Sequence, residues 1–188
     1  MQKTSSTIHP DLLAAQKLIY EPLGFVCTNI TKEAESEEYG AFVFDLNNQN
    51  INRCIKFRVA KITPTKNGQF VTLWKRIKNG PIIPHDLTDP IDLFVISVRH
   101  GEKFGHFVFP KAVLCTKDIV SKDDTGGKLG IRVYPPWDIT ESPQAKKKHK
   151  LGNCYIFLKS TQINLSTQLL FKNYIFNNVD IKKQNLCT

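Results

Sequence analysis

Polar and apolar residues alternate along 41–46 (AFVFDL) and along 51–62, and this alternation restricts the fold more than any other feature. Successive side chains of a β-strand point to opposite faces, whereas a helix repeats about every 3.6 residues. In the second stretch one face carries Ile51, Ile55, Phe57 and Val59, and the other carries Lys56 and Arg58. Both stretches are therefore expected to be half-buried strands, with Lys56 and Arg58 pointing away from the core.

Turn and strand signals extend this pattern along the chain. Asn67-Gly68 is typical of a tight hairpin turn, so we expect strands 51–62 and 70–76 to pair as one long hairpin. The stretch 91–98 is almost entirely apolar, which is typical of a central strand covered on both faces. Residues 105–110 and 131–137 are expected to add strands, and 112–116 fits either a strand or a short helix. Asn79–Pro90, with three prolines, is expected to be a loop.

One helix is expected before the strand-rich part of the chain and one after it. His9–Tyr20 has Pro10 in its first turn, and a second helix should begin after Ser142, with Pro143 at its first position. The 188 residues fit one domain. We predict an α+β fold: a single domain with a twisted, mainly antiparallel sheet or partial barrel and helices near the N- and C-termini. This domain should span 1–158, and 159–188 should form an Asn/Lys-rich extension, either packed or loosely ordered.

The net charge of +9 is unevenly distributed. Residues 51–78 contain eight Lys or Arg and no acidic residue, and 144–188 form a second basic block that includes lysines 146–148 and 150. Ordinary surfaces mix charges of both signs. A basic block of this kind favours an anionic partner, and nucleic acid is the partner we predict.

The predicted contact residues combine cations for phosphates with aromatic rings that stack on bases. They are Lys56, Arg58, Lys61, Lys66, Trp74, Lys75, Arg76, Arg132 and Tyr134. The register between the two hairpin strands decides which of these side chains share a face, and the sequence does not fix that register. The alternative for the basic block is a solvated sheet face with the aromatic rings in the core.

Several segments, in order, resemble the bacterial MepB family. They are FRVAKITPTKNGQFVTLWKR, GPIIP, DLFVISV, FVFPKAVL, GIRVYPPWD and SPQAKK, within residues 10–147. The resemblance implies a compact α+β domain and a link to nucleic acid, and it supplies no catalytic residues. The chain beyond about Leu158 departs from the family pattern and looks like an addition.

Two other function classes stay open. A metal-dependent nuclease could use Glu38, Asp45 and Lys56, which loosely match a D…(E/Q)-x-K arrangement. A regulatory module could instead present the basic face to an acidic protein. The five scattered cysteines and five histidines show no metal-ligand spacing, so no metal and no cofactor is expected. We expect no membrane segment and a cytoplasmic location, and the sequence does not indicate an oligomeric state.

Overall fold

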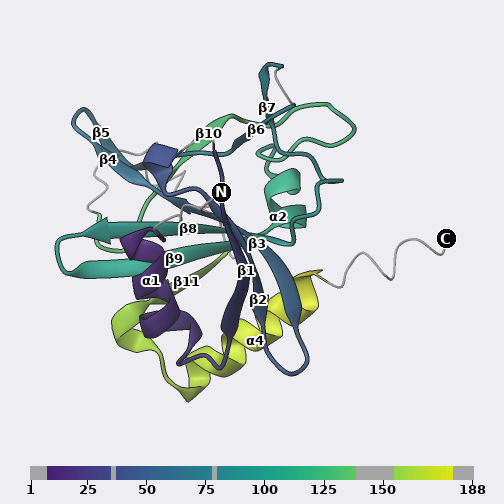
Figure 1. Cartoon of the computed structure of the whole chain (residues 1–188). Coiled ribbons are helices and arrows are strands. Elements are labelled where there is room, and N and C mark those ends of the chain that lie inside the picture. The colour runs from purple at the N-terminus through teal and green to yellow at the C-terminus, as the bar shows by residue number, and fades with distance from the viewer. Residues whose placement is uncertain (1–7, 35–36, 78–79, 139–154, 180–188) are drawn as a thin grey trace, which may run out of the picture.

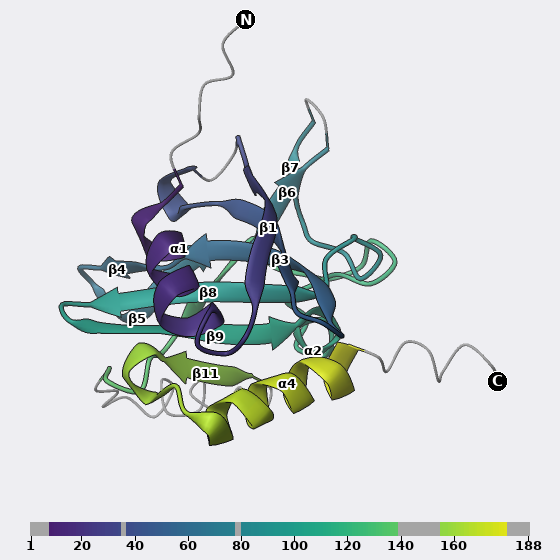
Figure 2. The same ribbon diagram turned by 60° about the horizontal axis from the view of Figure 1, so that its bottom comes forward.

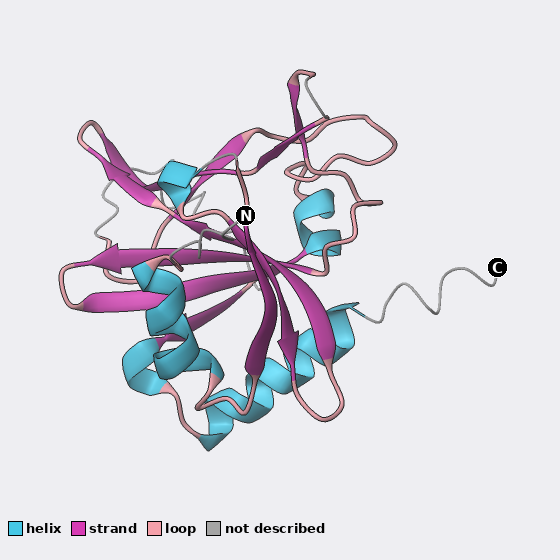
Figure 3. Cartoon of the chain, viewed as in Figure 1, coloured by secondary structure: helices cyan, strands magenta, loops and turns pink. Residues whose placement is uncertain are grey.

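Strands dominate the computed structural model, which describes residues 8–34, 37–77, 80–138 and 155–179 (Figure 1). The described strands are β1 (Val26–Lys32), β2 (Phe42–Asn47), β3 (Asn52–Val59), β4 (Lys61–Thr63), β5 (Lys66–Thr72), β6 (Trp74–Arg76), β7 (Ile82–Pro84), β8 (Leu93–His100), β9 (Lys103–Pro110), β10 (Gly130–Val133) and β11 (Ile156–Lys159). The helical segments are α1 (Pro10–Ala15), η1 (Gln16–Tyr20), η2 (Glu37–Tyr39), α2 (Lys111–Thr116), η3 (Ser160–Gln162) and α4 (Leu165–Val179). Figure 3 shows helices at the margins of the strands.

A six-stranded sheet organises the molecule, with the strand order β1-β2-β3-β8-β9-β11. Every neighbouring pair in it is antiparallel except β3 and β8, which run parallel, with Lys56 opposite Phe94. The parallel pair requires a long connection, and the segment between β3 and β8 holds β4 to β7. This connection builds a second layer over one face of the sheet.

The first face of the large sheet is covered by α1, η1 and α4 (Figure 2). Its core contains Phe44, Phe57, Val95 and Val108 from four neighbouring strands, together with helical residues such as Phe171. Helix α1 begins at Pro10, and the His9 side chain caps it by accepting a hydrogen bond from the Asp11 amide at 3.1 Å. This helix, expected over 9–20, is confirmed, with its last turn wound as the π-helical segment η1.

The opposite face is covered by a three-stranded sheet of order β10-β5-β4, together with α2. Val71 and Ile131 from the small sheet and Leu114 from α2 pack against Phe94 and other apolar residues of β8 and β9. Stretch 91–98 is thus buried on both faces, as its continuous apolar character predicts. A separate pair, β6 and β7, projects beyond this layer in Figure 1.

The predicted long hairpin is wrong. Strand β3 pairs with β2 and β8, and β5 pairs with β4 and β10, so the two predicted partners lie in different sheets. The tight turn lies between Thr63 and Lys66, which face each other, rather than at Asn67-Gly68. Gly68 instead adopts a φ of +78° inside β5, where a Cβ would approach the Tyr134 ring to 2.7 Å. Glycine is required there by both conformation and space.

The α+β prediction holds in part: the molecule is one domain and its strands pair mainly antiparallel, but strands dominate it, helices are few and the sheets are open. Segment 112–116, left open by the sequence, is helical, and the proline-rich loop 79–90 contains the short strand β7. The helix expected after Ser142 lies outside the described residues. Within the described residues, none of the helices is long and apolar enough to cross a bilayer.

Candidate nucleic-acid interface and a buried charge cluster

The structure does not bring the nine predicted contact residues together on one surface. Lys61, Lys66 and Arg132 lie on the side of the three-stranded sheet that faces away from the large sheet, which we call the outer face. Lys56 and Arg58 lie on the large sheet itself, beneath the second layer. The basic block 51–78 therefore does not form one continuous surface.

On the outer face, Lys61, Phe70 and Arg132 form a row across β4, β5 and β10. Phe70 lies directly opposite Lys61 on one side and opposite Arg132 on the other. The Arg132 guanidinium lies 5.7 Å from the Phe70 ring centre and donates to the Thr63 hydroxyl at 2.6 Å. The row is thus an aromatic ring between two cations, all three partly exposed.

Other groups extend the outer face. The Tyr39 ring packs edge-on against Phe70, with ring centres 6.3 Å apart, and the Lys61 ammonium lies 4.5 Å from the centre of the Tyr39 ring. Lys61 also pairs with Glu38 at 2.8 Å, which reduces its net field. Lys66 is exposed at the turn end of β5.

The remaining predicted contact residues differ in accessibility. Trp74 is half-buried, and the Arg76 guanidinium lies 5.7 Å from its ring. Lys75 forms an ion pair with Asp89. Tyr134 is buried over Gly68, so the expectation of an exposed stacking ring at this position is wrong.

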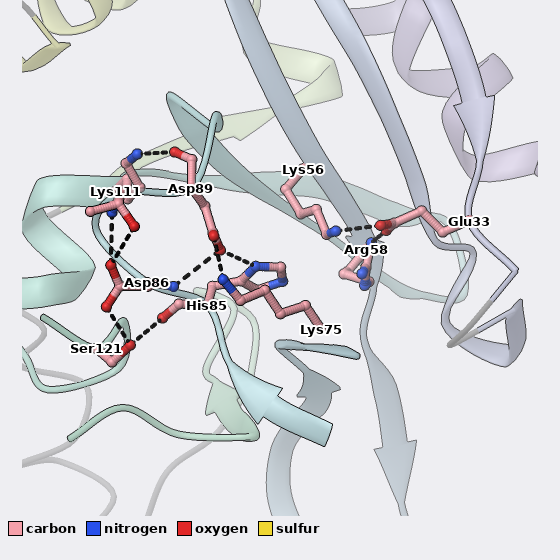
Figure 4. A network of polar contacts seen from close by, with 10 residues as sticks. Glu33, Lys56, Arg58, Lys75, His85, Asp86, Asp89, Lys111 and Ser121 are labelled. Carbon is pink, nitrogen blue, oxygen red and sulfur yellow. Dashed lines mark hydrogen bonds and ion pairs between the residues drawn. The ribbon is translucent and has the colours of Figure 1, made fainter. Parts of the chain in front are cut away.

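Lys56 and Arg58 belong to a partly buried group that we call the charge cluster, made of Glu33, Lys56, Arg58, Lys75, His85 and Asp89 (Figure 4). Lys56 donates to one carboxylate oxygen of Glu33, and a terminal nitrogen of Arg58 lies 2.5 Å from the other. The side chains of Lys56 and Arg58 are only 7% and 2% exposed, against 24% for Glu33. The expectation that both cations face solvent is wrong, because the second layer covers their face of the sheet.

Burial and mutual repulsion act on both cations of the cluster. Burial lowers the pKa of Lys56, and the nearby charge of Arg58 lowers it further, while Glu33 opposes both effects. Burial also lowers the pKa of Arg58. For Glu33, burial would raise the pKa, but the charges of Arg58 and Lys56 outweigh it and the net pKa is lowered. Glu33 is therefore ionised at neutral pH and balances one of two cations.

The other half of the cluster is built around Asp89. His85 Nδ1 lies 3.0 Å from one carboxylate oxygen of Asp89, and Lys75 donates to the other. Burial lowers the pKa of His85 more than Asp89 raises it, so the imidazole is neutral and its Nδ1–H donates. Burial would raise the pKa of Asp89, but bonds from His85 and Lys75 hold it well below its usual range.

Neighbouring loops hold this half in place. Lys111, at the start of α2, donates to the backbone oxygen of Asp89, and the Asp86 amide donates to the Asp89 carboxylate at 3.1 Å. Asp86 in turn accepts from the Ser121 hydroxyl at 2.8 Å. Figure 4 shows these groups on one side of His85, with Lys56 and Arg58 on the other.

The three residues predicted for a metal-dependent nuclease are not brought together. Glu38 pairs with Lys61, Asp45 accepts from the Asn29 side chain at 2.6 Å, and Lys56 contacts Glu33. Among the described residues, no group of three or more His, Cys, Asp or Glu side chains has the arrangement of a metal site. Glu38, Asp45 and Lys56 thus do not form a site that fits a metal ion.

Sequence reasoning missed Glu33, His85 and Asp89. Glu33 follows directly after β1, and the other two lie in the proline-rich segment expected to be a plain loop. A weak signal existed, since Lys56 and Arg58 alternate with core residues and need a partner if buried. Nothing in the spacing indicates which acid supplies it.

Comparison with known proteins relates this chain to one family by sequence and by fold. A family model described as MepB-like matches residues 33–158. The solved crystal structure of MepB is 26% identical, with a TM-score of 0.63, and the alignment covers 79% of this chain and 97% of that one. A bacterial homing endonuclease aligns over 89% of this chain and 91% of its own, but at 13% identity and a TM-score of 0.46, too remote to bear on function. No curated protein matches significantly.

Proposed function

The chain belongs to the MepB-like family, and from that premise we propose that it binds nucleic acid through the outer face of its three-stranded sheet. The observation that carries the proposal is the row of Lys61, Phe70 and Arg132, in which a partly exposed aromatic ring lies between two cations. Cations of this kind contact phosphates, and the ring offers a stacking platform for an unpaired base.

The charge distribution supports the same surface. Lys66 extends the row at one end of β5, and the half-buried Trp74 with Arg76 follows β5 along the chain. The proposed contact residues are therefore Lys61, Lys66, Phe70 and Arg132 on the outer face, with Trp74 and Arg76 on the neighbouring β6–β7 pair. Lys56, Arg58 and Lys75 are left out of the proposed phosphate contacts, because each is less exposed than Lys61 and is paired with a carboxylate that is itself partly buried.

The test is a salt titration of binding to a fluorescent single-stranded oligonucleotide. The double variant Lys61→Gln/Lys66→Gln should weaken binding and lower the slope of log K against log salt by about 1.4–1.8, because each phosphate contact contributes about 0.7–0.9. The control variant Lys17→Gln/Lys103→Gln removes two exposed lysines away from the outer face and should leave the slope unchanged.

Several outcomes would contradict the proposal. Binding that does not respond to salt would remove its electrostatic basis, and equal losses of affinity in the two double variants would remove the assignment to the outer face.

Phe70→Ala should cost about 1–3 kcal/mol of binding free energy for a single strand and much less for a duplex. Capture of an acidic protein that survives nuclease treatment, without oligonucleotide binding, would favour the interaction module instead. Metal-stimulated cleavage of the oligonucleotide would favour a phosphodiesterase.

A further inference from the structure

Two buried cations share one carboxylate in the charge cluster. Lys56 and Arg58 are two residues apart on β3 and point to the same face, and both contact the carboxylate of Glu33. The three groups together carry one excess positive charge. A charge held away from water is costly unless a partner neutralises it.

The surroundings only partly compensate this excess. Asp89 acts on Lys56 through its charge, but it is already bound by Lys75 and His85. Arg58 also donates to the backbone oxygen of Phe57 at 2.9 Å, while its Nε–H has no acceptor among the described residues. The cluster therefore offers an uncompensated charge together with a buried donor.

From this geometry we propose that Lys56 and Arg58 form a binding site for a phosphate dianion, whose position is taken in the structure by the Glu33 carboxylate. The charge balance favours a dianion, because it neutralises both cations, whereas one carboxylate leaves a net charge of plus one. The Arg58 guanidinium supplies several directional donors and the Lys56 ammonium supplies a point charge, a combination suited to phosphate oxygens.

Glu33 is the element that moves in this proposal. It is the most exposed of the three side chains and follows directly after β1, so its carboxylate can turn toward water. Its backbone amide bonds to the Ala41 oxygen at 2.9 Å, which holds the main chain in place while the side chain turns. Glu33 thus acts as a built-in competitor, and phosphate binds where the carboxylate leaves. This site is independent of the outer face.

The experiment compares Glu33→Gln with Glu38→Gln, a matched variant in which an exposed glutamate loses its charge beside Lys61. Inorganic phosphate is titrated by phosphorus NMR and by thermal unfolding, with chloride at equal ionic strength as the reference. Removing the competing carboxylate should tighten the apparent Kd for phosphate by about tenfold or more in Glu33→Gln. The Tm of this variant should fall in chloride and recover in phosphate, and Glu38→Gln should follow the wild type.

A phosphate response in Glu33→Gln equal to that of Glu38→Gln would overturn the proposal. If Glu33→Gln does not fold, Glu33→Asp serves as the second variant, because it keeps the charge but shortens the reach of the carboxylate. Its apparent Kd for phosphate should lie between those of the wild type and of a full removal of the carboxylate. An apparent Kd equal to that of the wild type would equally overturn the proposal. A 5′-phosphorylated dinucleotide tested against the unphosphorylated one separates a terminal phosphate from free phosphate as the source. The Lys61→Gln/Lys66→Gln variant should keep the phosphate response, which separates this site from the proposed nucleic-acid interface.

Discussion

His106 lies in the middle of β9 with no exposed surface, surrounded by the rings of Tyr20, Phe57 and Phe104 at 5.3–5.7 Å between centres. Burial lowers its pKa to about 3, and the charge of Arg99 contributes. The imidazole is therefore neutral, and its Nδ1 shares a hydrogen bond with the Tyr20 hydroxyl at 3.2 Å. At the scale of one residue, a polar side chain is kept in the core by this bond and by apolar packing.

The pH dependence of stability should reveal this residue. The pKa is about 3 in the folded state and about 6.5 when unfolded, so between these values only the unfolded state takes up the proton. Stability should fall as the pH drops, by roughly 2 kcal/mol from pH 7 to pH 5 on account of this group. The free energy of unfolding of His106→Gln, measured with urea, should therefore fall less than that of the wild type over the same pH interval, by roughly 2 kcal/mol. A variant whose pH dependence equals that of the wild type would contradict this assignment.

At the scale of elements, β11 adds the last strand to the large sheet by lying close against β9. Gly105 makes this approach possible, since a Cβ there would lie 2.6 Å from the Phe157 ring and 2.8 Å from the Leu158 oxygen. The ring could turn, but the backbone oxygen could not without loss of the pairing between β9 and β11. The glycine thus determines how closely the C-terminal strand can dock.

Gly105→Ala should destabilise the protein by roughly 1–3 kcal/mol, as overpacking does at other tight contacts. The measurement is urea unfolding followed by circular dichroism, with amide hydrogen exchange of β11 as the local readout. Gly101→Asn is the control, because that position is open and its φ of +56° is one that asparagine tolerates. If the amides of β11 in Gly105→Ala are as protected from hydrogen exchange as in the wild type, the strand adapts to the added methyl group without cost, which would contradict this prediction.

At the scale of the whole molecule, the large sheet is shared by two cores that depend on distant parts of the chain. Helix α4 lies beyond the region matched by the family model, which ends at Leu158. Its residues Phe171 and Ile175 are nevertheless buried in the first core, and Phe171 packs edge-on against Phe25 with 5.5 Å between ring centres. The described part of 159–188 is thus packed against the domain, one of the two possibilities that the sequence left open.

Phe171→Ala should therefore cost roughly 3–5 kcal/mol of unfolding free energy, because it removes a large side chain that is only 1% exposed. Leu169→Ala, on the same helix but 56% exposed, should change stability by less than about 0.5 kcal/mol. Chemical unfolding of both variants measures the difference. Equal effects would mean that α4 contributes little to the first core.

The local pattern predicted the elements better than their partners. Alternation placed Phe44 and Phe57 in the core, and the continuous apolar run placed β8 at the centre of the large sheet. The same alternation also set Lys56 and Arg58 on the opposite face of β3, which is where they lie. It could not show that this face is covered, because covering depends on how β4 and β5 fold back over the large sheet and on the more distant β10 and α2.

The sequence by itself determined where β2, β3, β8, β9 and the N-terminal helix form and which side chains of these strands share a face, since these follow from backbone geometry and local periodicity. Only the tertiary structure decided that β3 runs parallel to β8, that β5 lies in a second layer, and that Glu33 meets two buried cations. Strand pairing is set by the summed packing of distant segments, and a period of two fits many partners equally well. The exposed basic row and the buried charge cluster are therefore products of topology.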